Sequence, residues 1–475
     1  MSKTNTQILS EFLSGLKYED VPGGAVEQAK KMTLHTVGAA IASRGLPASR
    51  KPIELALDVG GKGEAAIWGS GGHKVSAQEA AFANGTLSDL LDWEDCSWTG
   101  HGSAGIIPAA MAIGEKKRCS GKDYLTAVVT GFEGYHRAAM AVQPSQDYLR
   151  SGNGWGLVSW QVFASAIPTG KLLGFDAAHF NQLFGACQYN TIVPTNRHSE
   201  GNRKSDVYHF CHGFCARNGV AAAAVTEKGF SNLNDCFEGK TSAYWQFVSD
   251  RLDYDWLVRD LGTQWYIHST YLKHWPANMW VQTSLEALDR IMKRRPFTLA
   301  DVKKIRVSPT LGMICANYAD SSRTALDAQF SIGYCMTAYI LDGNHRPGAH
   351  WFTEDRLNDP ELIAFADTKY EFFGPSVTTL DCFDDFRRGS FTEAVVEIEY
   401  TDGSRETESV LYPKGHPRNN FTMEEENEHF RLCCRPFMEE ETVEEILRLV
   451  GTLEELDDIT VLAEKLSDVR KEFAI

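Results

Sequence analysis

Apolar side chains recur at helical spacing through the first 230 residues and again from residue 422 to the end of the chain. Within the first region, Ser76 and Glu79 have the spacing of a capping box, which predicts the start of a helix, and Ser120 begins another. Both regions are therefore predicted to be mainly helical.

The pattern changes between about residues 265 and 410, where alternating apolar and polar positions indicate β-strands. Asp402 and Gly403 have the residue types of a hairpin turn between two of these strands. The predicted elements of this region are the strands Val302–Val307, Ala394–Tyr400 and Arg405–Leu411 and the helix Ala325–Leu341. The sequence thus predicts an α+β segment inserted in a helical chain.

The composition is ordinary for a globular enzyme, with 475 residues, 43% hydrophobic residues and a formal net charge of −16. This negative charge argues against nucleic acids and anionic membrane surfaces as partners. The 11 cysteines follow no disulfide framework, the N-terminus is polar, and no apolar run is long enough to span a membrane. We therefore expect reduced thiols and a cytoplasmic protein of two or three domains.

Residues 84–103 combine groups that can carry chemistry, because this stretch leaves one apolar helix, forms a loop and enters another. The loop contains the carboxylates Asp92, Glu94 and Asp95 together with His101. A polar loop held between two apolar helices is a common way to build an active site. The alternative interpretation is an acidic surface turn with one histidine.

Two histidines and two cysteines lie within residues 208–215, and these are the residue types of a metal site. Zinc sites usually draw their ligands from two separated pairs, however, and the sequence has no second pair. We therefore predict no metal here and expect Tyr208 or His212 to face a substrate. The sequence also lacks a phosphate-binding glycine loop and a nucleophile elbow.

Lys273 and His274 lie beside aromatic residues at the border of the α+β segment. A lysine next to bulky rings at a domain junction suits the capture of a substrate carboxylate. The alternative interpretation is a surface lysine whose aliphatic stem covers apolar neighbours.

Short motifs follow one another in a specific order over nearly the full chain. They are Asn84-Gly85, Leu91–Asp95, His101–Ser103 with Ile107–Ala110, His212–Gly219, Gly229-Phe230, Phe237–Lys240, Leu272-Lys273 with Pro276, Asp327–Tyr334, Leu341–Gly343, Tyr400–Gly403 and Lys414–Pro417. In this order and spacing the chain resembles the MmgE/PrpD family, which includes 2-methylcitrate dehydratase, cis-aconitate decarboxylase and iminodisuccinate epimerase.

The resemblance implies a mainly α fold with an inserted α+β domain, in which a large all-helical domain is formed from both chain ends and a smaller α+β domain acts as a lid. On this basis the domains are residues 1–266 (helical domain, first part), 267–410 (lid) and 411–475 (helical domain, C-terminal part). It also implies a homodimer that uses no cofactor and no metal, with the active site between the two domains.

Carried over residue by residue, the resemblance places the family's acidic residue on Asp92, its loop histidine on His101, its lid-side lysine on Lys273 and its lid-helix tyrosine on Tyr334. Eliminating water or CO2 next to carboxylates requires cations that hold the anion and a group that moves a proton at carbon. We therefore expect Lys273 to bind a carboxylate and His101 to transfer the proton. Asp92 would orient His101 or hold water, and Tyr334 would donate a hydrogen bond.

The chain departs from the family pattern at two positions. No histidine neighbours the turn that contains Trp155, and Tyr208 stands where the family usually has a lysine, with Lys204 close by but out of register. Both departures remove a polar group that a tricarboxylate would use.

Aromatic residues are frequent in the segments that match the family's site, and Trp160 and Trp275 are among them. Rings supply flat apolar area and little charge. We therefore hypothesise a substrate with fewer carboxylates and a larger apolar or ring portion than citrate; the alternative is that the tryptophans fill the core. The expected substrate-binding residues are Trp93, Cys96, Trp98, Trp155, Lys204, Tyr208, His212 and His274.

These observations favour a cofactor-independent lyase that acts on a small carboxylated molecule. Dehydration of a 3-hydroxy acid is the first hypothesis, decarboxylation of an unsaturated acid the second, and epimerisation or isomerisation at an acidic carbon the third. A non-enzymatic ligand-binding protein that keeps the fold is the alternative from another class.

Overall fold

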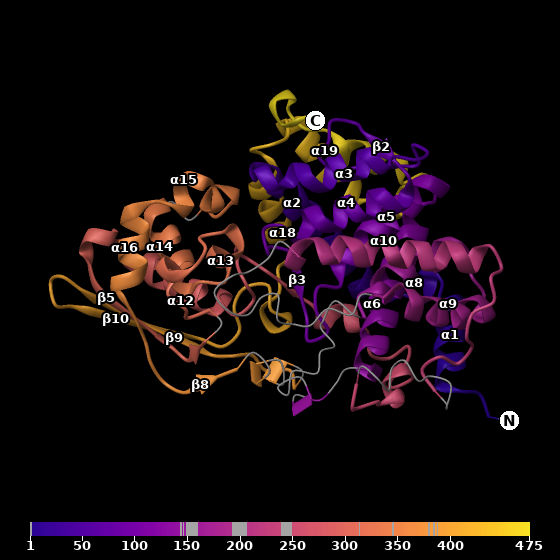
Figure 1. The fold of residues 1–475 in the computed structure, drawn as a ribbon, viewed down its shortest axis with the longest axis horizontal. Coiled ribbons are helices and arrows are strands. Elements are labelled where there is room, and N and C mark those ends of the chain that lie inside the picture. The colour runs from indigo at the N-terminus through magenta and orange to yellow at the C-terminus, as the bar shows by residue number, and fades with distance from the viewer. Residues whose placement is uncertain are drawn as a thin grey trace.

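A large helical body and a smaller α+β lid lie side by side (Figure 1). The computed structural model describes residues 2–142, 145, 147–148, 160–191, 207–238, 249–312, 314–343, 346–378, 381–382, 385–386 and 388–475. Elements from the beginning and the end of the chain both lie in the helical body, whereas the lid comes from the middle (Figure 1). The predicted fold class, mainly α with a smaller α+β part, is confirmed; the domain boundaries stay a prediction.

The helical body is built around α2 (Gly23–Ala42), most of whose side chains are buried. Helix α2 is rich in Ala and Gly, and a Cβ atom on Gly38 would already touch Cys433 of α18 at 3.4 Å. The other helices of the first part are α1 (Asn5–Gly15), α3 (Arg50–Val59), α4 (Ala77–Asp89), α5 (Ser103–Lys117), α6 (Gly121–Val142), α8 (Val162–Leu172), α9 (Ala177–Asn190) and α10 (Val207–Glu227). The C-terminal helices are α18 (Met423–Cys434), α19 (Glu440–Gly451) and α20 (Thr460–Ser467).

The two helix starts predicted from capping patterns are confirmed. The Ser76 side chain accepts from the backbone N–H of Glu79 at the start of α4. At the start of α6, Ser120 accepts from the N–H of Asp123 at 3.2 Å, and Asp123 accepts from the N–H of Ser120 at 3.3 Å. These side chains satisfy backbone donors that the first helical turn leaves unpaired.

The lid contains a four-stranded sheet with helices on one face (Figure 1). The strand order is β10-β9-β5-β7, with β9 antiparallel to both of its neighbours and β7 parallel to β5. Helix α12 packs against β9 and β10. The strands are β5 (Val302–Ser308), β6 (Thr310–Leu311), β7 (Tyr370–Phe372), β8 (Ser376–Val377), β9 (Ala394–Tyr400) and β10 (Arg405–Val410), and the helices are α12 (Gln282–Arg294), α13 (Ala325–Gln329), α14 (Ile332–Asp342), α15 (Glu354–Leu357) and α16 (Pro360–Thr368).

The single helix predicted over residues 325–341 is wrong in one respect, because the chain breaks it into α13 and α14. The side chain of Ser331 accepts from the N–H of Tyr334 and so begins a new helix. The predicted end is correct, since Gly343 closes α14 with a positive φ of 57°.

A short ribbon joins the helical body to the chain segment that enters the lid. In it, β3 (Asp95–Cys96) pairs antiparallel with β4 (Tyr271–Leu272). On the other side of β4, the N–H of Leu272 donates to the carbonyl of Gly415 at 3.1 Å. A Cβ atom on Gly415 would lie 1.7 Å from the Leu272 carbonyl oxygen, so only glycine fits this approach.

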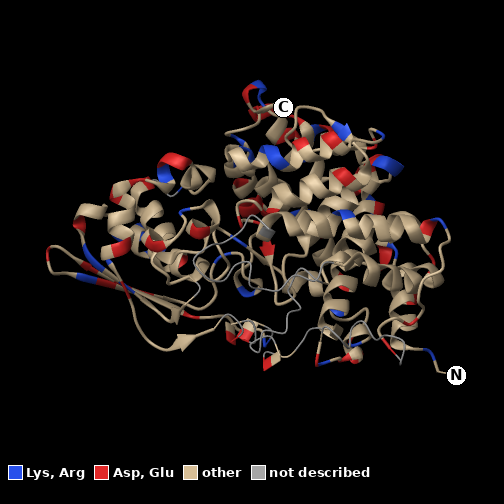
Figure 2. Cartoon of the chain, in the orientation of Figure 1, with Lys and Arg blue, Asp and Glu red and all other residues tan. Residues whose placement is uncertain are grey.

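Charged residues lie mostly on the outside of both parts, but acidic ribbon also appears in the middle of the molecule beside β3 (Figure 2). In the helical body, β1 (Ala65–Ala66) pairs antiparallel with β2 (Lys74–Val75). Within the residues that the structure describes, no helix combines the length and the apolar character needed to cross a membrane.

Close packing between α8 and α10 gives the first testable prediction. A Cβ atom on Gly219 would lie 2.0 Å from Ser165 Oγ and 2.5 Å from the Val162 carbonyl oxygen. We expect Gly219→Ala to lower the free energy of unfolding by about 1–3 kcal/mol in denaturant titrations, because overpacking forces the helices apart. Gly15→Ala is the control, since no atom lies within 4 Å of its added Cβ. Equal stability of the two variants would contradict the prediction.

Candidate active site

The loop between α4 and α5, residues 90–102, is buried along its whole length, and we call it the carboxylate loop. Asp92 adopts a left-handed backbone conformation with φ of 50°, which is uncommon for a residue with a side chain. Its N–H donates to the carbonyl of Asp89 at 2.8 Å, which closes the turn after α4. The Asp92 side chain is fully buried and one of its oxygens binds Lys273.

Lys273 follows β4 directly, and its backbone N–H donates to the carbonyl of Glu94 at 3.2 Å. The ribbon therefore fixes this lysine beside the carboxylate loop. Its ammonium is fully buried and donates to Asp92 Oδ1 and, at 2.7 Å, to Glu94 Oε1. Burial lowers the pKa of Lys273, but the charges of the two carboxylates outweigh burial and raise it above its usual value.

His101 is held by the same carboxylate oxygen, because its Nδ1 binds Glu94 Oε1. Burial raises the pKa of Glu94, but Lys273 and His101 pull it below its usual range, so this carboxylate is ionised and only accepts. Nδ1 of His101 therefore carries the proton. When the ring is neutral, Nε2 therefore carries no proton, and the Tyr208 hydroxyl lies 3.4 Å from it.

Gln161 and His212 contact the backbone and the ring of His101. The amide nitrogen of Gln161 donates to the backbone carbonyl of His101 at 2.6 Å, and its amide oxygen binds His212 Nδ1 at 2.8 Å. The ring centroids of His212 and His101 are 4.9 Å apart. This arrangement fixes both the backbone and the ring of His101.

Asp89, the last residue of α4, contacts a group of histidines. Its Oδ2 lies 2.8 Å from His209 Nδ1, and its Oδ1 lies 3.6 Å from His212 Nε2 and 3.8 Å from His101 Nδ1. Burial and the charges of Glu94 and Asp92 raise the pKa of Asp89 well above its ordinary value.

Asp95 has a structural role. One of its oxygens accepts from the backbone N–H of Ser103 at 3.0 Å and from the Ser103 hydroxyl, so it caps α5. Burial raises the pKa of Asp95 to about 6. This cap sets the direction in which the carboxylate loop enters the second apolar helix.

The structure brings together three of the four residues predicted to be catalytic: Asp92, His101 and Lys273. The fourth, Tyr334, lies elsewhere, because its hydroxyl donates to the Trp351 carbonyl inside the lid. This hydrogen bond satisfies the buried phenol, and we do not assign Tyr334 to the cluster.

Among the predicted substrate-binding residues, Tyr208 and His212 lie beside His101, and Cys96 lies in β3, within the carboxylate loop. The ring of His274 packs on Trp275 and Phe421, at ring-centroid distances of 4.2 and 5.5 Å.

Of the tryptophans predicted to bind substrate or to lie near the site, some pack in the core and others donate hydrogen bonds to backbone carbonyls. Trp98 packs with His136 and Tyr266 at ring-centroid distances of 5.2 and 6.0 Å. Trp160 donates through Nε1 to the Thr99 carbonyl at 2.7 Å, and Trp93 donates to the His274 carbonyl at 3.0 Å. Trp155 and Lys204 lie outside the described residues.

Sequence reasoning missed the central role of Glu94 and the contributions of Asp89, Gln161 and His209. A partial signal existed for Glu94, because it lies among the carboxylates of the same polar loop as Asp92 and His101. The other three contacts join separate helices, and no local pattern predicts them.

Two groups of described residues bring metal-type ligand atoms within 4.8 Å of one another: Asp89, Glu94 and His101, and His35, Glu426 and His429. In the first group the ammonium of Lys273 already binds Glu94, and its charge repels a cation. In the second, the two imidazole rings stack with an interplanar angle of 13°, so their lone pairs cannot converge on one ion. Neither geometry favours a metal, and the absence of metal and cofactor stays a prediction.

A buried layer from the two chain ends supports the carboxylate loop. His35 of α2 binds both oxygens of Glu426 of α18 at 3.1 and 3.2 Å, and it stacks on His429 at 4.6 Å. The edge of Trp93 meets the His429 ring at 5.1 Å. Burial raises the pKa of Glu426 to about 8 and lowers that of His35 to about 4, so the pair is neutral near pH 7.

Comparison with known proteins gives matches over nearly the whole chain. The MmgE/PrpD N-terminal domain matches residues 7–256 and the MmgE/PrpD C-terminal domain matches residues 275–455. The cis-aconitate decarboxylase of Aspergillus terreus is 25% identical over 97% of this chain and 96% of its own length. The cis-aconitate decarboxylases of Mus musculus and Homo sapiens are each 22% identical over 97% of this chain and 93% and 94% of their own lengths.

The raised pKa of Glu426 makes a prediction about stability and pH. Its pKa is about 8 in the folded protein against an ordinary 4.5, so its stabilising effect is complete below pH 4.5 and is lost as the pH rises toward 8. Glu426→Gln keeps a neutral side chain. We expect its free energy of unfolding, relative to the wild type, to increase by up to about 1.4 kcal/mol per pH unit across this window.

The measurement is urea unfolding at several pH values between 5 and 8. Glu424→Gln on the same helix is the control, because the Glu424 side chain is 77% exposed. A stability difference between Glu426→Gln and the wild type that does not change with pH would show that Glu426 is ionised in the folded protein.

Proposed function

The chain belongs to the MmgE/PrpD family, and we propose that it is a lyase that eliminates water from a small hydroxy acid. The observation that carries the proposal is the shared oxygen of Glu94, which binds the proton-bearing nitrogen of His101 and the ammonium of Lys273 in a buried site. Such a site holds a base and a cation in fixed positions, as elimination next to a carboxylate requires.

His101 is the group that moves the proton. Its Nε2 removes a proton from the carbon beside the substrate carboxylate, and the C–H electron pair forms the new double bond. The hydroxyl on the neighbouring carbon leaves as water after it receives the proton back from Nε2. Glu94 stabilises the imidazolium that exists between these two events, because it accepts from Nδ1.

Lys273 and Asp92 hold the substrate. An ammonium has three N–H donors, and Asp92 and Glu94 use two of them, so the third is available to a substrate carboxylate. Asp92 Oδ2 and Glu94 Oε2 are buried and have no hydrogen-bond donor among the described residues. Buried acceptors without a donor favour a substrate that brings hydroxyl groups.

Decarboxylation of an unsaturated acid is the second candidate, and the relatives named above as cis-aconitate decarboxylases favour it. The same His101 would then give a proton to the carbon that loses CO2. Dehydration is preferred here because of the unpaired acceptors on Asp92 and Glu94.

The substrate is proposed to carry few carboxylates. The described cluster contains four buried carboxyl groups, Asp89, Asp92, Glu94 and Asp95, against the single ammonium of Lys273. Tyr208 presents a neutral hydroxyl next to His101. A tricarboxylate would gain little electrostatic stabilisation from this set of groups.

The role of His101 is tested with the substituted acid 3-hydroxy-3-phenylpropionate in D2O. The wild type is expected to exchange the proton beside the carboxylate and to form cinnamate, both followed by NMR. His101→Gln should lower both rates about 100-fold or more, because a positioned acid–base group contributes that much. His179→Gln, whose side chain is 50% exposed, is the control. Wild-type rates in His101→Gln would remove this residue from the mechanism.

The same assay compares reaction classes. Release of CO2 from an unsaturated acid without dehydration would favour the decarboxylase. Proton exchange beside the carboxylate without elimination would favour an epimerase, and tight binding with neither would favour a ligand-binding protein.

The prediction about substrate charge is tested with 2-methylcitrate. We expect kcat/KM for this tricarboxylate to be at least about tenfold lower than for the aromatic hydroxy acid, since each charged hydrogen bond that is lost costs that much or more. Comparable turnover of the two compounds would contradict the expected preference for a less charged substrate.

A further inference from the structure

A cavity of about 740 Å³ lies between the lid and the end of α18, within the size range of small-molecule sites. The lid contributes residues 342, 346–350 and 353 to its wall, and the helical body contributes residues 428, 431–433 and 435–437. At its edge the two parts are in contact, because a Cβ atom on Gly45 would lie 2.7 Å from the Cβ of Ala349. An occupant of this cavity would therefore touch both parts at once.

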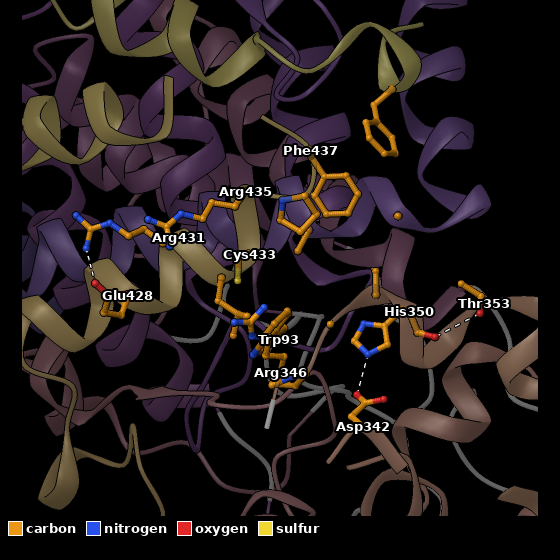
Figure 3. Close-up of a pocket in the computed structure, with 18 residues that line it drawn as sticks. Trp93, Asp342, Arg346, His350, Thr353, Glu428, Arg431, Cys433, Arg435 and Phe437 are labelled. Atoms are coloured by element: carbon orange, nitrogen blue, oxygen red, sulfur yellow. Dashed lines mark hydrogen bonds and ion pairs between the residues drawn. The ribbon is translucent and has the colours of Figure 1, made fainter. Parts of the chain in front are cut away.

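The cavity combines an apolar floor with a basic wall. Figure 3 shows Arg431 and Arg435 together on the α18 side and His350, bound to Asp342, on the lid side. The apolar lining comes from Trp93, Leu432, Pro436, Phe437 and Phe473. Such a surface suits a molecule with an aromatic or short aliphatic body and one charged end.

The charge of the lining favours an anion. Three arginines line the cavity against two acidic residues, Asp342 and Glu428, in a protein whose net charge is −16. Asp342 is bound to His350 and Arg356, and Glu428 to Arg431. Arg435 uses Nε and Nη2 on Glu440, and its Nη1 makes no hydrogen bond to any described residue. One guanidinium edge is thus available to a carboxylate.

Trp93 connects the cavity to the carboxylate loop. Trp93 is one of the residues that line the cavity, with only 1% of its surface exposed, and its sequence neighbours Asp92 and Glu94 bind Lys273. The ring is held by its hydrogen bond to the His274 carbonyl and by its edge contact with His429. A ligand that packs on Trp93 therefore acts on the three-residue segment that positions Lys273.

We propose that this interdomain cavity is a second ligand site, which binds a small amphipathic monocarboxylate and acts as an effector site for the carboxylate loop through Trp93. The ligand's ring or alkyl body lies on the apolar floor, and its carboxylate binds Arg435. Binding at this site does not depend on the proposed lyase activity.

The experiment is calorimetric titration of the full-length protein with 3-phenylpropionate. 3-Phenylpropan-1-ol provides the same body without charge, and inorganic phosphate provides charge without the body. Leu432→Trp on α18 and Thr353→Phe on the lid each place a large ring in the cavity. Two such variants are used so that the test remains possible if one of them fails to fold. Arg435→Gln removes the proposed anion contact, and Arg405→Gln, with a side chain that is 74% exposed on β10, is its matched control.

Saturable binding is expected for 3-phenylpropionate, with about tenfold weaker binding in Arg435→Gln, unchanged binding in Arg405→Gln and no binding in either filled variant. Trp93→Phe should keep the heat of binding but lose the accompanying change in tryptophan fluorescence. His101→Gln should bind as the wild type does. The proposal is wrong if the alcohol or phosphate binds equally well, if the filled variants bind normally, or if His101→Gln abolishes binding, which would place the ligand at the catalytic cluster.

Discussion

One oxygen atom of Glu94 holds the centre of this molecule together, because the ammonium of Lys273 and the imidazole of His101 both bind it. Burying an unpaired charge is strongly unfavourable, and removing one partner of a buried ion pair typically costs about 3–5 kcal/mol. The carboxylates come from the helical body, whereas Lys273 lies on the segment that leads into the lid. The ion pairs of Lys273 therefore link the helical body to the segment that leads into the lid.

Buried carboxyl groups in this protein fall into two kinds according to their neighbours. Glu94 has a cation and an imidazole beside it and stays ionised. Asp89 and Glu426 contact histidines, and the charges of Lys273 and Lys31 do not offset the effect of burial, so the pKa values of both groups rise. The ionised group lies where the proposed reaction moves a proton, and the groups with raised pKa values lie around it.

Local patterns in the sequence predicted the elements and part of the site. Capping residues located α4 and α6, and alternation located β5, β9 and β10. The break between α13 and α14 was missed because Phe330 continues the apolar pattern while the hydroxyl of Ser331 starts a new helix. Propensity alone does not decide such a competition.

For the site, chemistry and family resemblance together selected Asp92, His101 and Lys273, which the fold does bring together. They also selected Tyr334 and His274, whose side chains the fold directs into packing. Orientation depends on contacts between distant segments: Lys273 and Glu94 are 179 residues apart. The sequence did not reveal the contacts of Asp89, Gln161 and His209, because these contacts form only when separate helices pack together.

The close approach of Gly415 to β4 has a consequence for biosynthesis. The strand that carries Lys273 is flanked on one side by β3, from the first hundred residues, and on the other by Gly415, from beyond the lid. A nascent chain on the ribosome can form the early helices, but it lacks this second flank until the lid has been made. Both flanks of this strand, and with them the full surroundings of Lys273, are therefore present only after nearly the whole polypeptide has been made.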